Sequence, residues 1–163
     1  MSKTLEELED DYWGEAEYDS YLVQTCHALR HKPIDQFSVE DLRIMIGQNI
    51  GLVHLLPPAM DVIRGNPFAS GDFYDGDLLQ SVLRCELVQS GESELTSDLK
   101  AICARFVETL DSQAYENLFG DDAPEKYGLS DISATALRQE EVKKLAGESP
   151  FSDCLLFLKT HGN

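Results

Sequence analysis

The stretch SDLKAICARFVETL, residues 97–110, gives the clearest indication of the fold. Its apolar residues recur with the 3.6-residue period of an α-helix and fall on one face, namely Leu99, Ile102, Cys103, Phe106, Val107 and Leu110. This pattern is typical of a helix that buries one stripe in a core. We therefore predict a core helix that starts at Ser97.

Four helices are expected before this one. Their predicted ranges are 21–32, about 39–49, a segment that begins at Pro57-Pro58 and stops at Gly65-Asn66-Pro67, and about 77–87. The second has the clearest start, because Ser38 is a good N-cap and Asp41 completes a variant of the capping box. Prolines suit the first turn of the third helix, where N–H groups lack intrahelical partners. A loop is expected over 91–97.

Two further helices are expected after the core helix. One covers about 133–145, and the other follows Ser149-Pro150 with Phe151, Cys154, Leu155 and Leu158 on its inner face. The polar stretch 120–128, between the core helix and these two, is expected to be flexible. Because no segment shows sustained strand alternation, we predict an all-α protein. The prediction is a single-domain multi-helix bundle of about seven helices over residues 1–163, in which 1–19 form an acidic and partly loose lead segment.

The chain is strongly acidic, with 30 Asp and Glu against 13 Lys and Arg and a formal charge of −17. Such a surface would repel nucleic acids, whose binding depends on Lys and Arg, so direct DNA or RNA binding is not expected. A basic protein partner fits the charge, although acidity that serves only solubility remains an alternative. No apolar run approaches the roughly 18 residues of a membrane span, and no secretory signal is recognisable, so we expect a cytoplasmic protein.

Signals for catalysis are weak. Cys26, Cys85, Cys103 and Cys154 are far apart in the chain and fit reduced core thiols better than a zinc site. His27 and His31 are one helical turn apart, but a pair without a third ligand is a weak metal signal. No phosphate loop, nucleotide fingerprint or nucleophile elbow is present. We therefore predict no catalytic residues, no metal and no cofactor, with a metal-dependent hydrolase that uses His27, His31 and nearby acids as a minor alternative.

A contact surface is expected at the loop GDFYDGD, residues 71–77. Its carboxylates stand beside two aromatic side chains, a combination that suits a basic target. Asp77 is interpreted as a cap of the following helix rather than as a contact. The residues predicted to contact the partner are Asp72, Tyr74 and Asp75 in the loop and Glu15, Glu17 and Asp19 in the lead segment.

Residues 20–83 resemble bacterial immunity proteins of contact-dependent growth inhibition (CDI) systems. The resemblance follows an acidic lead that contains a tryptophan and consists of short segments in order and at plausible spacing. They are SYLV (20–23), CHALR (26–30), KP (32–33), VEDLR (39–43), IGQ (46–48), GL (51–52), LLPP (55–58), GDFY (71–74) and GDLL (76–79). The half after Leu87 carries no comparable segment.

The resemblance implies a binding protein without catalytic activity. Such proteins neutralise the C-terminal toxin domain that a neighbouring cell delivers through a large surface protein. A nuclease that acts on tRNA or other RNA fits the acidity best, because its phosphate-binding Lys and Arg would attract a carboxylate-rich surface. The alternative is a small acidic helical adaptor or regulator that binds some other basic partner.

Overall fold

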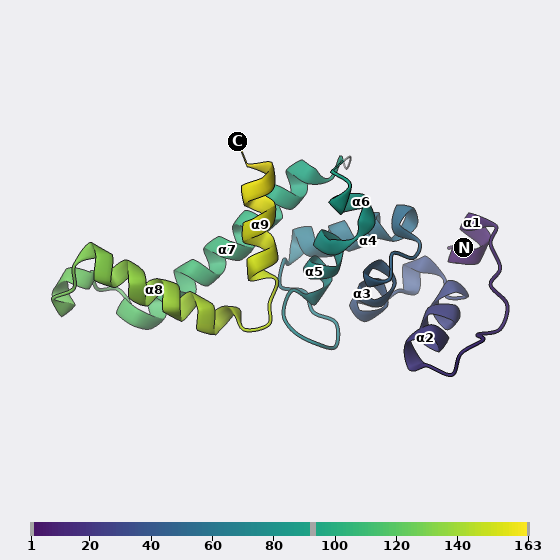
Figure 1. Ribbon diagram of the computed structural model, residues 1–163, viewed down its shortest axis with the longest axis horizontal. Coiled ribbons are helices and arrows are strands. Elements are labelled where there is room, and N and C mark those ends of the chain that lie inside the picture. The colour runs from purple at the N-terminus through teal and green to yellow at the C-terminus, as the bar shows by residue number, and fades with distance from the viewer. Residues whose placement is uncertain (1, 92–93, 163) are drawn as a thin grey trace. The chain divides into compact units, whose positions relative to one another are not determined.

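The computed structural model describes residues 2–91 and 94–162 (Figure 1). Every regular element in these two ranges is helical, which confirms the predicted all-α class. Contacts between Cα atoms divide the chain into two compact units, Met1–Thr96 and Ser97–Asn163, called here the N-terminal and C-terminal units. That all 163 residues act as one domain stays a prediction.

The N-terminal unit consists of short helices. They are α1 (Leu5–Glu9), α2 (Tyr21–Arg30), a 3-10 turn (Ile34–Gln36), α3 (Val39–Gly47), α4 (Leu52–Gly65), α5 (Asp77–Arg84) and α6 (Glu86–Gln89). Helix α3 starts as predicted, since Ser38 Oγ accepts a hydrogen bond from the Asp41 N–H and Asp41 Oδ2 accepts one from the Ser38 N–H. Such a reciprocal cap satisfies N–H groups that the first helical turn leaves open.

Helices α3, α4 and α5 pack together and form the core of this unit. Fully buried side chains come from all three, including Met45 and Ile46 of α3, Leu55 and Ile63 of α4, and Leu78, Leu79 and Val82 of α5. Burying each such side chain stabilises the fold by roughly 1.5–3 kcal/mol. The packed helices therefore form a rigid core from which the connecting loops project.

The predicted start of the third helix at Pro57-Pro58 is wrong. Helix α4 begins five residues earlier at Leu52, after Gly51 in the left-handed conformation with φ 64°, and both prolines lie inside it. Its buried stripe runs without a break through Leu52, Leu55, Leu56, Ala59, Met60 and Ile63. The apolar burial on this stripe outweighs the two intrahelical hydrogen bonds that the prolines cannot donate.

The predicted helix over 77–87 is two helices. Helix α5 ends at Arg84, Cys85 is extended with ψ 154°, and α6 begins at Glu86. The Glu86 N–H donates to Asn49 Oδ1 at 2.9 Å, so a side chain beyond α3 caps the new helix. The expected loop over 91–97 lies partly outside the described residues, and α7 already begins at Thr96.

The C-terminal unit contains α7 (Thr96–Phe119), a 3-10 turn (Pro124–Tyr127), α8 (Asp131–Ala146) and α9 (Phe151–His161). In Figure 1, α8 runs beside the second half of α7, and α9 crosses α7 nearer its start. An ion pair between Arg138 and Asp111 links α8 to α7. The Cys154 thiol is hydrogen-bonded with Cys103 and links α9 to α7.

Two details of this unit differ from expectation. Helix α7 continues well beyond Leu110, because Ala114 and Phe119 extend its buried stripe. On α9, Leu155 is 45% exposed rather than buried, and Phe157 faces inward with Cys154. The Phe157 ring also lies 4.3 Å from the ring of His161, one turn later on the same helix.

The described residues hold nine α-helices instead of about seven. The two additional helices are the short α1 in the lead segment and α6. Both are a single turn or little more, and both depend on contacts made by distant residues. Such helices are marginal in isolation and leave little signal in a sequence.

Candidate partner-binding surface

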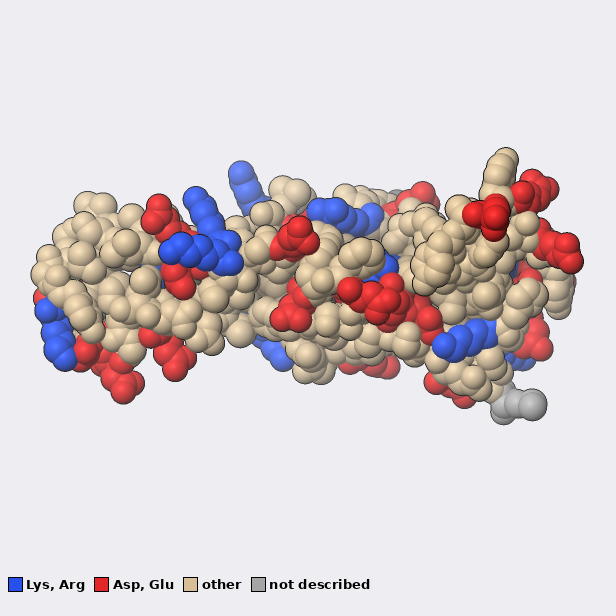
Figure 2. All heavy atoms as spheres, turned by 90° about the horizontal axis from the view of Figure 1, so that it is seen from below, with Lys and Arg blue, Asp and Glu red and all other residues tan. Residues whose placement is uncertain are grey.

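The acidic surplus is concentrated in the N-terminal unit. Residues 1–96 contain 18 acids and six bases, whereas residues 97–163 contain 12 acids and seven bases. On the face drawn in Figure 2, clusters of acidic side chains lie over the N-terminal unit, which is at the right of the picture as in Figure 1. A basic partner would therefore be attracted mainly to this unit.

Backbone N–H groups of residues 71–77, called here the acidic loop, donate hydrogen bonds to the carboxylates of Asp77 and Glu40. Asp77 is 3% exposed, and its two oxygens accept hydrogen bonds from the Gly71 N–H at 2.7 Å and the Phe73 N–H at 3.2 Å. Glu40 Oε2 accepts a hydrogen bond from the Asp72 N–H at 2.9 Å. Three consecutive backbone N–H groups are thus fixed by two acids, and the loop has a defined conformation.

This arrangement corrects the interpretation of Asp77 as a helix cap. The N-cap of α5 is Gly76, which makes no side-chain capping bond, and Asp77 is the first helical residue. Its carboxylate turns back to the loop that precedes the helix. Asp77 is a positioning residue for the acidic loop, in keeping with the expectation that it makes no partner contact.

Arg43 of α3 lies at the centre of these acids. It donates to both Glu40 oxygens at 2.6 Å, and its Nε is 3.7 Å from Asp77 Oδ2. The hydrogen bond from Arg43 lowers the pKa of Glu40, and the bond to Glu40 raises the pKa of Arg43. The Arg43 guanidinium also lies 4.4 Å from the centroid of the Phe73 ring.

Close contact between the loop and α3 requires a glycine at position 71. A Cβ added to Gly71 would overlap Glu40 Oε2 and lie 3.1 Å from the Glu40 Cα. The backbone of the loop therefore approaches α3 more closely than any residue with a side chain would allow. This explains the first residue of the GDFY segment in physical terms.

The predicted loop contacts differ in their exposure. Asp72 and Asp75 are exposed, whereas Tyr74 is half-buried and donates its hydroxyl hydrogen bond to Gln80. The most exposed aromatic side chain of the loop is Phe73, at 69%, which the predicted contact residues omitted. A phenylalanine inside a run of aspartates, followed by Gly76 and Asp77 at the i+3 and i+4 positions, is the sequence signal that could have indicated its exposure.

The acids predicted in the lead segment lie at a different place. Glu15, Glu17 and Asp19 are all exposed, and Asp19 accepts a hydrogen bond from the Gln24 side chain at 2.6 Å. Asp19 contacts α2, whereas the acidic loop contacts α3 and α5. The predicted residues thus form two separate groups, one in the lead segment and one in the acidic loop.

Arg30 of α2 attaches the lead segment. It is 1% exposed, donates to Glu9 Oε2 and to the Asp11 carbonyl at 2.6 Å each, and its guanidinium lies 4.3 Å from the Trp13 ring. Leu5 of α1 is fully buried. The first residues of the chain are thus joined to α2 by a buried cation and by apolar packing.

The predicted core thiols are confirmed, since Cys26, Cys85, Cys103 and Cys154 are all buried and free. Burial raises the pKa of Cys26 and of Cys85. The hydrogen bond with Cys103, together with burial, raises the pKa of Cys154. These thiols are poor nucleophiles and poor metal ligands in the folded state.

The histidines considered as metal ligands have other contacts. His27 Nδ1 is 3.2 Å from the Gly14 carbonyl oxygen, and His31 Nδ1 is 3.0 Å from Glu6 Oε2. Over residues 2–91 and 94–162, no group of three or more His, Cys, Asp or Glu side chains is arranged to hold a metal ion. Within the same ranges, no helix combines the length and apolar character needed to cross a membrane.

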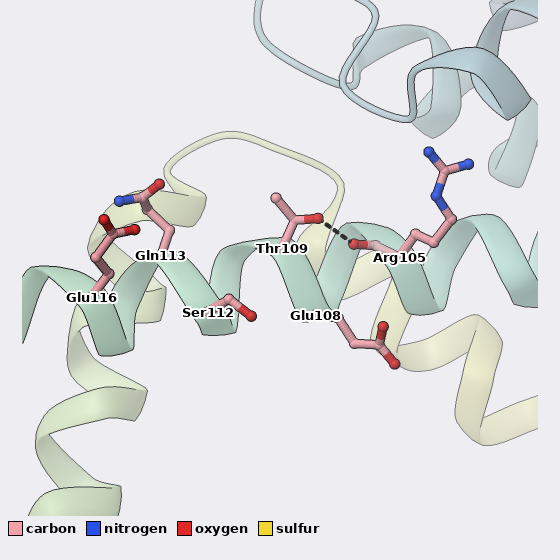
Figure 3. Close-up of a pocket in the computed structure, with 6 residues that line it drawn as sticks. All are labelled: Arg105, Glu108, Thr109, Ser112, Gln113 and Glu116. Carbon is pink, nitrogen blue, oxygen red and sulfur yellow. Dashed lines mark hydrogen bonds between the residues drawn. The ribbon is translucent and has the colours of Figure 1, made fainter. Parts of the chain in front are cut away.

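A hollow of about 420 Å³ lies along α7 in the C-terminal unit (Figure 3). It is lined by Arg105, Glu108, Thr109, Ser112, Gln113 and Glu116. All six side chains come from one helix, and the Thr109 hydroxyl donates to the Arg105 carbonyl oxygen at 2.7 Å. Side chains on one face of one helix cannot surround a substrate, so this hollow is not a candidate active site.

The sequence family described as CDI immunity proteins matches residues 7–99. The chain belongs to this family. No curated protein and no solved structure matched it. The family match covers the N-terminal unit from α1 onward and ends three residues into the C-terminal unit. Membership supports an immunity function against a CDI toxin, and proteins of this kind are generally not enzymes.

Proposed function

We propose that this immunity protein binds the toxin domain of its cognate CDI effector through the acidic N-terminal unit, and that the toxin is a nuclease, most simply one that cleaves tRNA or other RNA. The proposal rests on one observation, that the family match and most of the acidic residues fall in the same part of the chain. The family match covers residues 7–99, and the same part of the chain holds 18 of the 30 acids.

A nuclease explains this charge through the chemistry of its own substrate. Enzymes that bind RNA hold the phosphates with Lys and Arg, and these side chains present a positive surface. A carboxylate-rich protein surface can cover that region, accelerate encounter and discriminate between toxins. Binding at this surface would neutralise the toxin without any catalytic step by the immunity protein.

The contact residues we propose are those that combine exposure with negative charge. Asp72 and Asp75 project from the acidic loop, whose backbone is already fixed. Glu15, Glu17 and Asp19 form a second exposed acidic group in the lead segment. Tyr74 is also proposed as a contact; its hydroxyl already donates to Gln80, so we expect a smaller contribution from it than from the two aspartates.

The direct test measures binding between the purified protein and the toxin domain encoded beside it. Replacing Asp72 and Asp75 together by Asn should weaken binding by roughly 5- to 30-fold, mostly through the association rate, because each exposed charge contributes about 0.5–1 kcal/mol. The association rate of the unaltered protein should fall steeply as salt rises. Helicity and thermal stability should stay nearly unchanged.

A matched control is Glu108→Gln with Glu116→Gln, which removes two exposed charges from α7 in the C-terminal unit. This pair should leave toxin affinity nearly unchanged. If the unaltered protein forms no complex with the adjacent toxin domain, the proposed function is wrong. Equal losses in both double variants would show that only net charge matters and would remove the acidic loop from the interface.

A further inference from the structure

Resting on the proposed function, we infer that the acidic loop receives one arginine side chain of the toxin on the open face of Phe73, beside Asp72 and Asp75. In this arrangement Phe73 contacts the partner, and Arg43 and Asp77 hold Phe73 in position. The group recognised on the partner is a guanidinium.

Phe73 is exposed and yet held in place. Its backbone N–H is bonded to Asp77, and the neighbouring N–H groups of Gly71 and Asp72 are bonded to Asp77 and Glu40. The ring rests on the Arg43 guanidinium at 4.4 Å, while 69% of the residue remains exposed to solvent. An apolar side chain fixed in this way loses little entropy when a partner covers it.

The charges around the ring favour a second cation. This group holds one base, Arg43, and four acids, Glu40, Asp72, Asp75 and Asp77. Arg43 pairs with Glu40 and lies 3.7 Å from Asp77. Glu40 and Asp77 are engaged by Arg43 and by backbone N–H groups, whereas Asp72 and Asp75 have exposed side chains. The group therefore keeps a net negative charge that Arg43 does not balance.

An arginine fits this place better than a lysine. Its planar guanidinium can stack on an aromatic face and pair with a carboxylate at the same time. The contact between Arg43 and Phe73 already shows that the ring accepts a guanidinium on one side. Nucleases that bind phosphate carry exposed arginines, so the proposed partner supplies the group required.

The experiment compares Phe73→Leu and Phe73→Trp with the unaltered protein in binding to the adjacent toxin domain. Leucine keeps an apolar side chain but removes the aromatic face, so we expect about 3- to 30-fold weaker binding, mostly in the dissociation rate. Tryptophan restores an aromatic face and should bind as tightly as the unaltered protein. Because neither change alters charge, the salt dependence of association should stay the same, in contrast to the Asp72 and Asp75 variants.

Val53→Ala is the matched control, because Val53 is an apolar residue that is 73% exposed on α4 of the same unit. It should bind like the unaltered protein. Thermal unfolding of every variant should agree within a few degrees, which would separate recognition from folding.

Replacing each exposed arginine and lysine of the toxin by alanine identifies the partner group. One arginine should weaken binding to the unaltered protein but have little further effect on Phe73→Leu, as expected for two residues in contact. The inference is overturned if Phe73→Leu binds as tightly as Val53→Ala, if Phe73→Trp fails to restore affinity, or if the coupled toxin residue is not an arginine. Failure of the unaltered protein to bind the toxin would instead overturn the proposed function.

Discussion

Replacing Gly51 by alanine should loosen the lead segment. Gly51 precedes α4 with φ +64°, and an added Cβ would lie 2.8 and 2.9 Å from the two terminal methyl carbons of Leu5. Leu5 is fully buried, so its methyl groups have little room to shift, and we expect α1 to move away. The left-handed conformation costs an alanine about 1–2 kcal/mol, and loss of the buried Leu5 costs about 1.5–3 kcal/mol more. The expected loss in the free energy of unfolding is about 2.5–5 kcal/mol.

The assay uses the single tryptophan of the chain, Trp13, which lies against Arg30 and His27. Release of α1 should move the Trp13 emission towards that of a solvent-exposed indole before the helices unfold. Urea unfolding followed by circular dichroism reports the global loss, and Trp13 fluorescence reports the lead segment. The two transitions should separate in Gly51→Ala.

Gly91→Ala isolates the backbone contribution, because Gly91 has φ +75° and, among the described residues other than its chain neighbours, no atom lies within 4 Å of an added Cβ. It should cost only about 1–2 kcal/mol. In a double-mutant cycle, Leu5→Ala should remove part of the penalty of Gly51→Ala, since the colliding methyl groups are gone. If Gly51→Ala costs no more than Gly91→Ala, or if the cycle shows strict additivity, the reasoning from this contact is refuted.

Three more predictions concern pH, thiols and packing. Arg43 lowers the pKa of Glu40 below its ordinary 4.5. The stability that Glu40 contributes is therefore present above about pH 4.5 and is lost as the pH falls below it. Urea unfolding of Arg43→Met, measured across this pH range, should show a weaker loss of stability with acid. The buried thiols, including Cys154 with its raised pKa, should react slowly with Ellman's reagent at pH 8, whereas all four should react in denaturant; fast reaction in the folded protein would contradict their burial. Phe157→Ala should destabilise the C-terminal unit by about 3–5 kcal/mol, and an unchanged melting temperature would place Phe157 outside the core.

The sequence predicts those helices whose apolar period and end signals agree. Helix α3 follows its capping box at Ser38, and the stripe from Leu99 to Leu110 lies in α7 as expected. Errors arise where tertiary contacts override a local signal. Burial along α4 places Pro57 inside a helix, and a distant Asn49 side chain starts α6 immediately after the end of α5.

The candidate site is only partly readable from the sequence. The run 71–77 indicates an acidic aromatic loop, and the exposure of Asp72 and Asp75 agrees with that reading. What the sequence cannot show is the set of contacts from α3, about thirty residues earlier, that orders the loop. Because Arg43 lies beneath Phe73 only after folding, the exposed aromatic side chain is identified from the structure rather than from the motif.

The first turn of α7 is a suitable place to join the N-terminal unit to a different C-terminal sequence. The family match ends at residue 99, within that turn, and every contact that orders the acidic loop involves residues before it. A chimera that keeps residues 1–99 and takes a foreign continuation would therefore inherit the acidic loop intact.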